Sequence, residues 1–146
     1  MEKILMLHGI NHDKMGKGDH SSHGSTTMED LNEQLTEKAR TLGIEMDFFQ
    51  SNDEKSVIQK IEAAGNESYA GILFNPASWI ENGEEIAGAL AKLDIPVLEV
   101  HMSNTNKETI SRNVIAPSVT GLITGFGEKV YTTGLEILVE DIRENG

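Results

Sequence analysis

The chain has 146 residues, with 12 Lys and Arg against 24 Asp and Glu, five His and no Cys. The length suits one domain with one hydrophobic core, and the formal net charge of −12 disfavours a nucleic acid or an anionic membrane as partner, because both are bound by basic surfaces. The absence of Cys excludes disulfides, thiolate catalysis and Cys-ligated metals, and we expect a cytoplasmic location.

Five short apolar runs, typical of β-strands, divide the chain. They cover residues 4–7, 46–49, 71–74, 97–100 and 121–123. Three of them are nearly continuous in hydrophobic residues, as expected of strands buried on both faces of a parallel sheet. The first run begins close to Met1 and none approaches the roughly 18 apolar residues that cross a bilayer, so we expect neither a signal peptide nor a membrane span.

Helical periodicity fills the intervals between these runs. Apolar residues recur at helical spacing over 28–42, 57–61, 86–93 and about 128–143, and a further crossover is expected at about 107–114. Strands that alternate with helices predict right-handed βαβ units. The sequence therefore predicts an α/β fold over residues 1–146, with a doubly wound five-stranded parallel sheet in a three-layer sandwich.

Polar residues follow the predicted strands, where folds of this class bind their ligands. Glu99 and His101 share one strand face, so the carboxylate can orient the imidazole as an acid or base. Asn75, Ser103 and Arg112 are candidate substrate contacts through an amide, a hydroxyl and a guanidinium group. Each of these residues also has a structural interpretation. His101 can be a histidine that a neighbouring carboxylate satisfies, and Asn75 can be a turn former. Ser103 can be a helix cap, and Arg112 can belong to a surface ion pair.

Four of the five histidines lie in the first 23 residues. The segment 14–27 is long and polar, which is typical of a lid over a site. A divalent metal is one interpretation of the cluster, although no recognised ligand spacing is present. Its candidate ligands are His8, Asp13, His23, Glu81 and His101.

The ordered set of fragments resembles the type II dehydroquinases (3-dehydroquinate dehydratases) over nearly the whole chain. The fragments that carry the resemblance are residues 4–9 with Asn11, 24–30, 50–52, Asn75-Pro76, 95–104, Arg112 and 121–127. The resemblance implies a flavodoxin-like fold and trimers that commonly assemble into dodecamers. It also implies dehydration of 3-dehydroquinate through an enolate, without a cofactor.

Carried over residue by residue, the resemblance makes His101, paired with Glu99, the group that interacts with the departing hydroxyl. The positions that it implies for substrate binding are Asn11, Asn75, Glu81, the backbone N–H of Met102, Ser103 and Arg112.

Several active-site positions depart from the family pattern. His23 falls where the family has the lid tyrosine that abstracts the proton, and Gly18 falls where it has the arginine that helps this tyrosine to ionise. Imidazole is largely neutral at pH 7 and needs no such cation, so His23 is a candidate general base. His8 also differs, because it replaces an asparagine of the family pattern. Gly88 replaces a carboxylate that a neighbouring subunit usually contributes.

Two further departures add negative charge. Asp13 replaces the asparagine that positions a water, and Glu81 replaces a substrate-binding histidine. At about 4 Å and an effective dielectric near 20, one like-charge pair costs on the order of 4 kcal/mol before screening. Weak or no activity on 3-dehydroquinate is therefore expected, unless a metal or the lid residues Lys14 and Lys17 compensate.

Three hypotheses follow for the function. The first is a lyase that acts on a small polar substrate, such as a cyclic one, with His23 as base, His101 as acid, Asp13 as a further catalytic residue and no cofactor. The second is a metal-dependent hydrolase or lyase on the same scaffold. The third is a non-catalytic, small-molecule-binding homo-oligomer. His12 and His20 receive no role in any of them.

Overall fold

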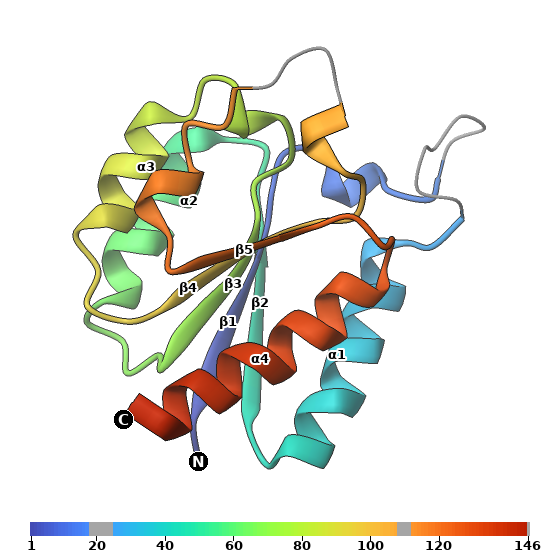
Figure 1. The fold of residues 1–146 in the computed structure, drawn as a ribbon, viewed down its shortest axis with the longest axis vertical. Helices are drawn as coiled ribbons and strands as arrows, with labels where there is room; N and C mark the ends of the chain where they lie inside the picture. Colours follow the sequence, from blue (N-terminus) through green and yellow to red (C-terminus); the bar gives the residue numbers. More distant parts are fainter. Residues whose placement is uncertain (18–24, 108–111, 146) are drawn as a thin grey trace.

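A five-stranded parallel sheet runs through the middle of the molecule (Figure 1), in a computed structural model that describes residues 1–17, 25–107 and 112–145. The strands are β1 (Lys3–His8), β2 (Glu45–Gln50), β3 (Gly71–Asn75), β4 (Val97–His101) and β5 (Gly121–Thr124). Their order in the sheet is β2-β1-β3-β4-β5. This is the flavodoxin-like order of doubly wound folds, so the predicted fold class is confirmed.

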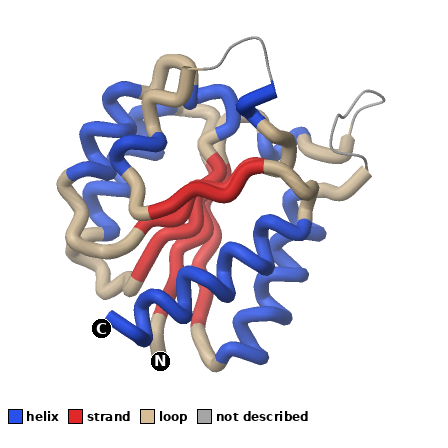
Figure 2. Tube along the Cα trace, in the orientation of Figure 1, coloured by secondary structure: helices blue, strands red, loops and turns tan. Residues whose placement is uncertain are grey.

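Four helices cover the two faces of the sheet, which gives the predicted three layers (Figure 2). Helices α1 (Met28–Leu42) and α4 (Lys129–Asn145) pack together on one face, whereas α2 (Glu54–Ala64) and α3 (Glu84–Ala91) pack together on the other. The amino terminus and the end of α4 lie near each other at the amino edge of the sheet (Figure 1).

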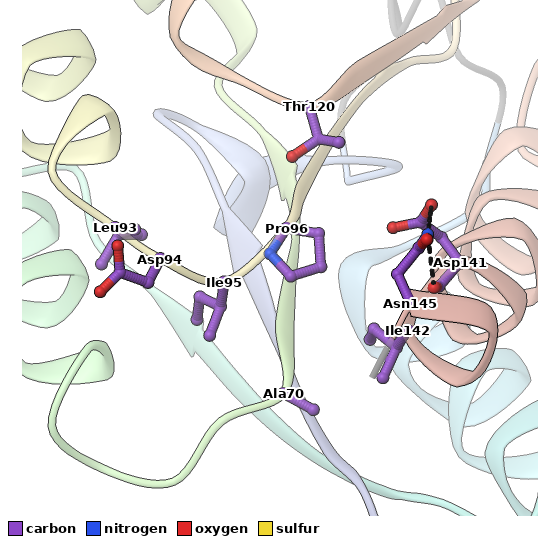
Figure 3. Close-up of a pocket in the computed structure, with 9 residues that line it drawn as sticks. All are labelled: Ala70, Leu93, Asp94, Ile95, Pro96, Thr120, Asp141, Ile142 and Asn145. Carbon is purple, nitrogen blue, oxygen red and sulfur yellow. Dashed lines mark hydrogen bonds between the residues drawn. The ribbon is translucent and has the colours of Figure 1, made fainter.

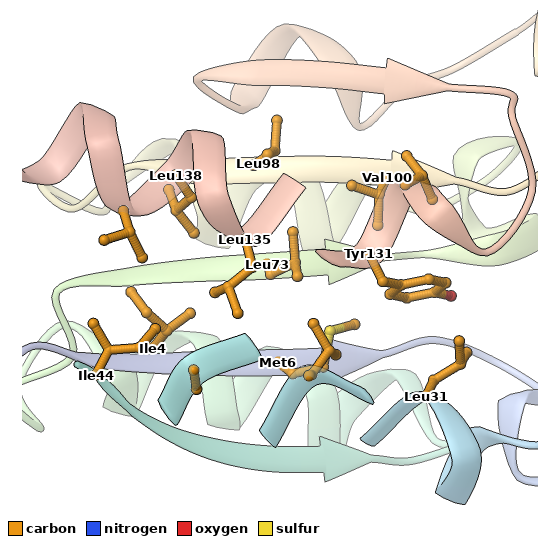
Figure 4. Packing of buried hydrophobic residues seen from close by; sticks show 14 of the residues in the cluster. Ile4, Met6, Leu31, Ile44, Leu73, Leu98, Val100, Tyr131, Leu135 and Leu138 are labelled. Carbon is orange, nitrogen blue, oxygen red and sulfur yellow. The ribbon is translucent and has the colours of Figure 1, made fainter. Parts of the chain in front are cut away.

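The core divides into two halves because side chains alternate along each strand. Ile4 and Met6 of β1 pack with Leu35 and Leu135 in the half beneath α1 and α4 (Figure 4). Leu5 of β1 lies in the other half, beneath α2 and α3. Because both faces are covered, β1 reads as a continuous apolar run rather than an alternating one.

Local signals set the bounds of α1. Thr27 Oγ1 accepts a hydrogen bond from the backbone N–H of Asp30, and the Asp30 carboxylate accepts one from the N–H of Thr27. This capping box satisfies two donors that the first helical turn leaves unpaired. Gly43 ends the helix in the left-handed conformation with φ of 71°.

The connection from β4 to β5 differs from the other crossovers. A crossover was expected at about 107–114, and residues 108–111 of it lie outside the described part of the chain. The described part of this connection contains two short 3₁₀ helices, η3 (Thr105–Lys107) and η4 (Ala116–Ser118), and residues 112–114 are not helical. Asn113 Oδ1 accepts hydrogen bonds from the N–H groups of Ile115 and Ala116. This side chain offers the backbone an alternative to a helix, which explains the local turn.

The sheet order places the ends of β1 and β3 side by side. β2 lies on one side of β1 in the sheet, and β3 lies on the other side. The order of the strands therefore changes direction between β1 and β3. His8 and Asn75 are register partners at their carboxyl ends. Ligands of doubly wound folds bind at this switch point.

Candidate active site

A cavity of about 200 Å³ lies beyond the carboxyl ends of β3 and β4. The residues that line it are His12, Asn75, Ala77, Ser78, Ile80, Glu81, His101, Met102, Ser103 and Thr105. Five of the predicted site residues therefore come together in space, although they lie in two separate parts of the sequence. They are Asn75, Glu81, His101, Met102 and Ser103.

The His101 imidazole and the Glu99 carboxylate form a buried pair. His101 Nε2 lies 2.5 Å from Glu99 Oε2, and both side chains are buried. Asn113 Nδ2 donates a second hydrogen bond to the same oxygen at 2.8 Å, which helps to hold the carboxylate in place. Glu99 can therefore orient the imidazole, which suits a proton-transferring group.

Asn75 is held by contacts on both sides of its amide. Nδ2 donates to the Tyr131 hydroxyl at 2.7 Å, and Oδ1 accepts from the backbone N–H of Ala77 at 3.0 Å. The second contact holds Ala77 at a φ of 54°, a left-handed conformation that is uncommon outside glycine. Burial raises the pKa of Tyr131, so this phenol stays neutral.

The segment after β1 brings a second imidazole to the cavity. Gly9 continues β1, and its backbone N–H donates to His12 Nδ1 at 2.9 Å. A Cβ atom at Gly9 would lie 2.4 Å from the Asn75 carbonyl oxygen, so the close approach of the ends of β1 and β3 requires glycine here. His12 is buried and lines the cavity.

His8 lies beneath the site rather than in it. Its Nε2 is 2.7 Å from Asn32 Oδ1 of α1, and its Nδ1 is buried without a hydrogen-bond partner among the described residues. Burial lowers the pKa of His8, and the bond to Asn32 opposes this shift only in part. A buried, neutral imidazole of this kind is a core group, not a wall of the cavity.

Asn11 and Asp13 belong to a separate polar cluster beside the end of β2. The backbone N–H of Asn11 donates to Asn52 Oδ1 at 2.7 Å, and Asn52 Nδ2 donates to Asp13 Oδ1 at 3.3 Å. Neither residue lines the cavity. The structure thus does not bring these two predicted site residues into contact with the others.

Arg112 is likewise not at the cavity. Its side chain is exposed, and Nη2 donates to Glu84 Oε2 at 2.9 Å. The surface ion pair, which was the structural interpretation of this residue, is the arrangement seen here.

Glu81 in contrast lines the cavity and is exposed, so one of the two carboxylates that the sequence predicted for the site is present.

The expected metal ligands are dispersed in the described part of the chain. His8 contacts Asn32, Asp13 contacts Asn52, and His101 contacts Glu99. Among residues 1–17, 25–107 and 112–145, no group of three or more His, Asp or Glu side chains is arranged to hold a metal ion. Gly18, His20 and His23, and with them most of the expected lid, lie outside the described residues.

A larger hollow of about 500 Å³ lies at the opposite edge of the sheet (Figure 3). Ala70, Pro96 and Thr120 line it just before their strands begin, together with Ile142 and Asn145 near the end of α4. Asn145 donates to the carboxylate and the carbonyl of Asp141 there. The lining of this hollow contains no histidine and no His–carboxylate pair, so the smaller cavity is the candidate site.

Sequence reasoning missed four residues that build the site. His12 lines the cavity, Asn113 holds Glu99, and Tyr131 and Asn32 contact Asn75 and His8. Asn113, Tyr131 and Asn32 each lie far along the sequence from the residue that they contact. The spacing of residues along the sequence carries no signal for such contacts.

Known proteins resemble the chain over nearly its full length. The family model described as "Dehydroquinase class II" matches residues 2–139. Proteins named 3-dehydroquinate dehydratase from Syntrophotalea carbinolica and Caldicellulosiruptor bescii are 39% and 38% identical to it, covering 92% and 96% of this chain and 93% and 98% of their own.

Solved structures agree with this similarity. A type II dehydroquinase from Butyrivibrio crossotus superposes with a TM-score of 0.89 at 31% identity, covering 94% of this chain and 97% of its own. A 3-dehydroquinate dehydratase-like protein from Bifidobacterium longum superposes with a TM-score of 0.74 at 26% identity, covering 97% of this chain and 98% of its own.

In the described residues, no helix has the length and apolar character needed to cross a membrane.

Proposed function

Because the chain belongs to the class II dehydroquinase family, we propose that it is a carbon–oxygen lyase that removes water from 3-dehydroquinate or a closely related cyclic hydroxy acid. The observation that carries this proposal is the buried His101–Glu99 pair in the wall of a polar cavity at the switch point of the sheet. Such a pair supplies the acid that an elimination of water needs.

The reaction has two steps in this proposal. A base removes a proton from the carbon next to the ketone, and the electron pair of that C–H bond forms an enolate. The enolate then expels the hydroxyl group, which takes a proton from His101 and leaves as water. Glu99 orients the imidazole for that transfer, and Asn113 keeps the carboxylate in place.

We assign the base to His23 on the resemblance alone, since this residue lies outside the described part of the chain. We assign substrate contacts to Asn75 and Ser103, and their position in the lining of the same cavity as His101 supports this assignment. The roles of Asn11, Asp13 and Arg112 at the substrate stay predictions, and a substrate-induced movement is needed to bring these three side chains to the cavity.

We further propose that turnover of 3-dehydroquinate is slow. Two observations support it: His23 and Gly18 replace the tyrosine and arginine that the family resemblance leads one to expect, and the Glu81 carboxylate lines the cavity that receives an anionic substrate. Like charges at contact distance cost on the order of 4 kcal/mol before screening.

The test is a dehydration assay with purified, untagged protein and 3-dehydroquinate. The conjugated product absorbs in the ultraviolet, and mass spectrometry confirms the loss of water. We expect kcat well below the typical enzyme value of about 10 s⁻¹, and we expect His101→Ala to abolish the reaction. Asn66→Ala, an exposed change far from the site, is the matched control.

The outcomes separate the parts of the proposal. A kcat within tenfold of about 10 s⁻¹ contradicts the slow turnover but keeps the lyase. No dehydration of 3-dehydroquinate or of related cyclic hydroxy acids contradicts the lyase, and leaves the non-catalytic binding hypothesis. Retained activity in His101→Ala contradicts the assigned acid. Activity that is lost in chelator and restored by a divalent ion favours the metal hypothesis.

We also propose that the working form is a cytoplasmic homo-oligomer, either a trimer or a dodecamer built from four trimers. The family resemblance and the apolar residues exposed at the β5 side of the molecule support the oligomer. The absence of Cys fits a reducing compartment.

A further inference from the structure

We propose that Tyr131 is a positioning residue of the candidate site. Its buried hydroxyl group accepts one N–H of Asn75, and this contact fixes the amide so that its second N–H donates to an oxygen atom of the substrate. The inference deepens the proposed function and rests on it for the identity of the substrate. It gives a role to a tyrosine that belongs to the hydrophobic core and does not line the cavity.

The two partners of Asn75 decide which way its amide points. The backbone N–H of Ala77 lies 3.0 Å from one amide atom. Because a backbone N–H can only donate, that atom is the oxygen Oδ1. The other atom is then Nδ2, which donates one N–H to the Tyr131 hydroxyl oxygen at 2.7 Å. The orientation of the amide therefore follows from the chemistry of its partners.

This orientation leaves one donor of Asn75 for a ligand. An amide NH₂ group carries two N–H donors, and among the described residues only Tyr131 accepts one of them. Asn75 lines the same cavity as His101. The second N–H thus suits a hydroxyl, carbonyl or carboxylate oxygen of a small polar substrate.

The hydroxyl group of Tyr131 is explained by this contact rather than by packing. The side chain is fully buried on α4, in the half of the core that includes Leu31, Val100 and Leu135 (Figure 4). Burial of a hydroxyl group without a hydrogen bond opposes folding, and its partner among the described residues is Asn75. A phenylalanine would fill the same space without that cost.

The two supports of the amide come from different elements. Tyr131 belongs to α4, which packs on β3 and β4, whereas Ala77 belongs to the turn that follows β3. Without the Tyr131 oxygen, the amide keeps only the contact with Ala77 and can turn about its Cβ–Cγ bond. A hydrogen bond weakens steeply as its angle closes, so such a turn weakens the contact with a substrate oxygen.

Two matched substitutions separate this role from general support of the core. Tyr131→Phe keeps the ring and removes only the oxygen that holds Asn75. Tyr69→Phe is the control, because Tyr69 is also buried and its hydroxyl donates to Asp47 Oδ2 at 2.6 Å. Tyr69 precedes β3, whereas Asn75 ends it. Both variants lose one tyrosine hydrogen bond, but only one of these bonds reaches the site.

The first experiment measures kcat and KM with 3-dehydroquinate, and Kd by calorimetry when turnover is too slow. We expect Tyr131→Phe to raise KM or Kd by about threefold to tenfold, up to the value of one hydrogen bond. We expect kcat to stay within about twofold, because uniform binding is lost and the acid is untouched. Tyr69→Phe should keep the wild-type KM. A wild-type KM in Tyr131→Phe, or an equal rise in both variants, overturns the proposal.

A double substitution shows whether Tyr131 acts through Asn75. If it does, Asn75→Ala and the double variant Asn75→Ala/Tyr131→Phe have the same KM or Kd, because no amide is left to release. If the two single effects multiply instead, Tyr131 acts through the fold in general, and the proposal is overturned.

A further measurement does not depend on the substrate. In ¹⁵N-labelled protein without ligand, the side-chain NH₂ signals of Asn75, identified by their loss in Asn75→Ala, report exchange with water. We expect exchange at least about tenfold faster in Tyr131→Phe, and unchanged exchange overturns the proposal. If the wild type neither binds nor converts 3-dehydroquinate, the proposed function fails, while the exchange rates still support or overturn the positioning.

Discussion

His8 is a titratable side chain that the fold keeps neutral. It is buried beneath the site, with Nε2 near Asn32 Oδ1 and Nδ1 unpaired among the described residues. Desolvation of the charged form lowers its pKa below the ordinary histidine value. The imidazole therefore resists protonation in the folded chain, while the unfolded chain accepts the proton at about pH 6.5.

This difference predicts a pH dependence of stability. Below about pH 6.5 the unfolded state binds one proton more than the folded state at His8, so the free energy of unfolding falls as the pH falls, by at most about 1.4 kcal/mol per pH unit. His8→Asn removes the titrating group, and this part of the slope should disappear. Urea denaturation at pH 5, 6 and 7 measures it. The prediction is contradicted if the free energy of unfolding falls with pH by the same amount in the wild type and in His8→Asn.

Other residues of the site show how far residue-level reasoning goes. The Glu99–His101 contact was predicted because residues two apart on a strand share a face, and the structure confirms it. The contact of Asn113 with Glu99 was not predicted, since it joins a loop to a strand 14 positions away. Spacing determines neighbours along one element, but not neighbours between elements.

At the level of elements, the carboxyl end of β1 packs against the end of β3 with no space for a side chain. A Cβ atom at Gly9 would lie 2.4 Å from the Asn75 carbonyl oxygen and 2.7 Å from the Pro76 backbone. Those atoms belong to the backbone and cannot rotate away. Any larger residue must therefore separate the two strand ends that support His12 and Asn75.

Gly9→Ala is expected to cost about 1–3 kcal/mol in the free energy of unfolding, the range for overpacking a filled site. It should also reduce kcat/KM, because both walls of the cavity move. The matched control is Gly88→Ala in α3, where a Cβ atom meets nothing within 4 Å. That change should stabilise the protein by about 0.4–1 kcal/mol, since alanine favours helix. Equal stability of the two variants would contradict this account.

The elements themselves follow the sequence closely. All five strands and the four main helices appear where hydrophobic periodicity predicted them. The connection from β4 to β5 was the least regular, and its described residues form 3₁₀ turns on either side of Asn113. A weak apolar pattern and a side chain that competes for backbone donors explain the difference.

The whole molecule exposes apolar side chains on one side. Leu122 on β5, Phe126 after it and Ile137 on α4 are 40%, 90% and 46% exposed. β5 is an edge strand of the sheet, and exposed edges are commonly covered by another chain. One sheet draws its strands from residues 3 to 124. That residues 1–146 form a single domain stays a prediction.

The prediction for the whole molecule is a homo-oligomer. Size-exclusion chromatography with light scattering should give three or twelve times the 16.0 kDa of one chain. Phe126→Glu places a charge on the most exposed of these three side chains and should shift the mass toward the monomer. Lys92→Glu, exposed on the end of α3, is the control and should not. A monomeric wild type at micromolar concentration would contradict the oligomer.

The sequence by itself determined the layers of this protein, the family to which it belongs and the contact between Glu99 and His101. Hydrophobic periodicity and residues two apart on one strand are local properties, so a linear pattern contains them. Only the tertiary structure decided which polar residues share a cavity. It brought His12 to Asn75 and His101, and placed Arg112 on Glu84. The order of strands in the sheet sets these distances, and no spacing along the chain encodes that order.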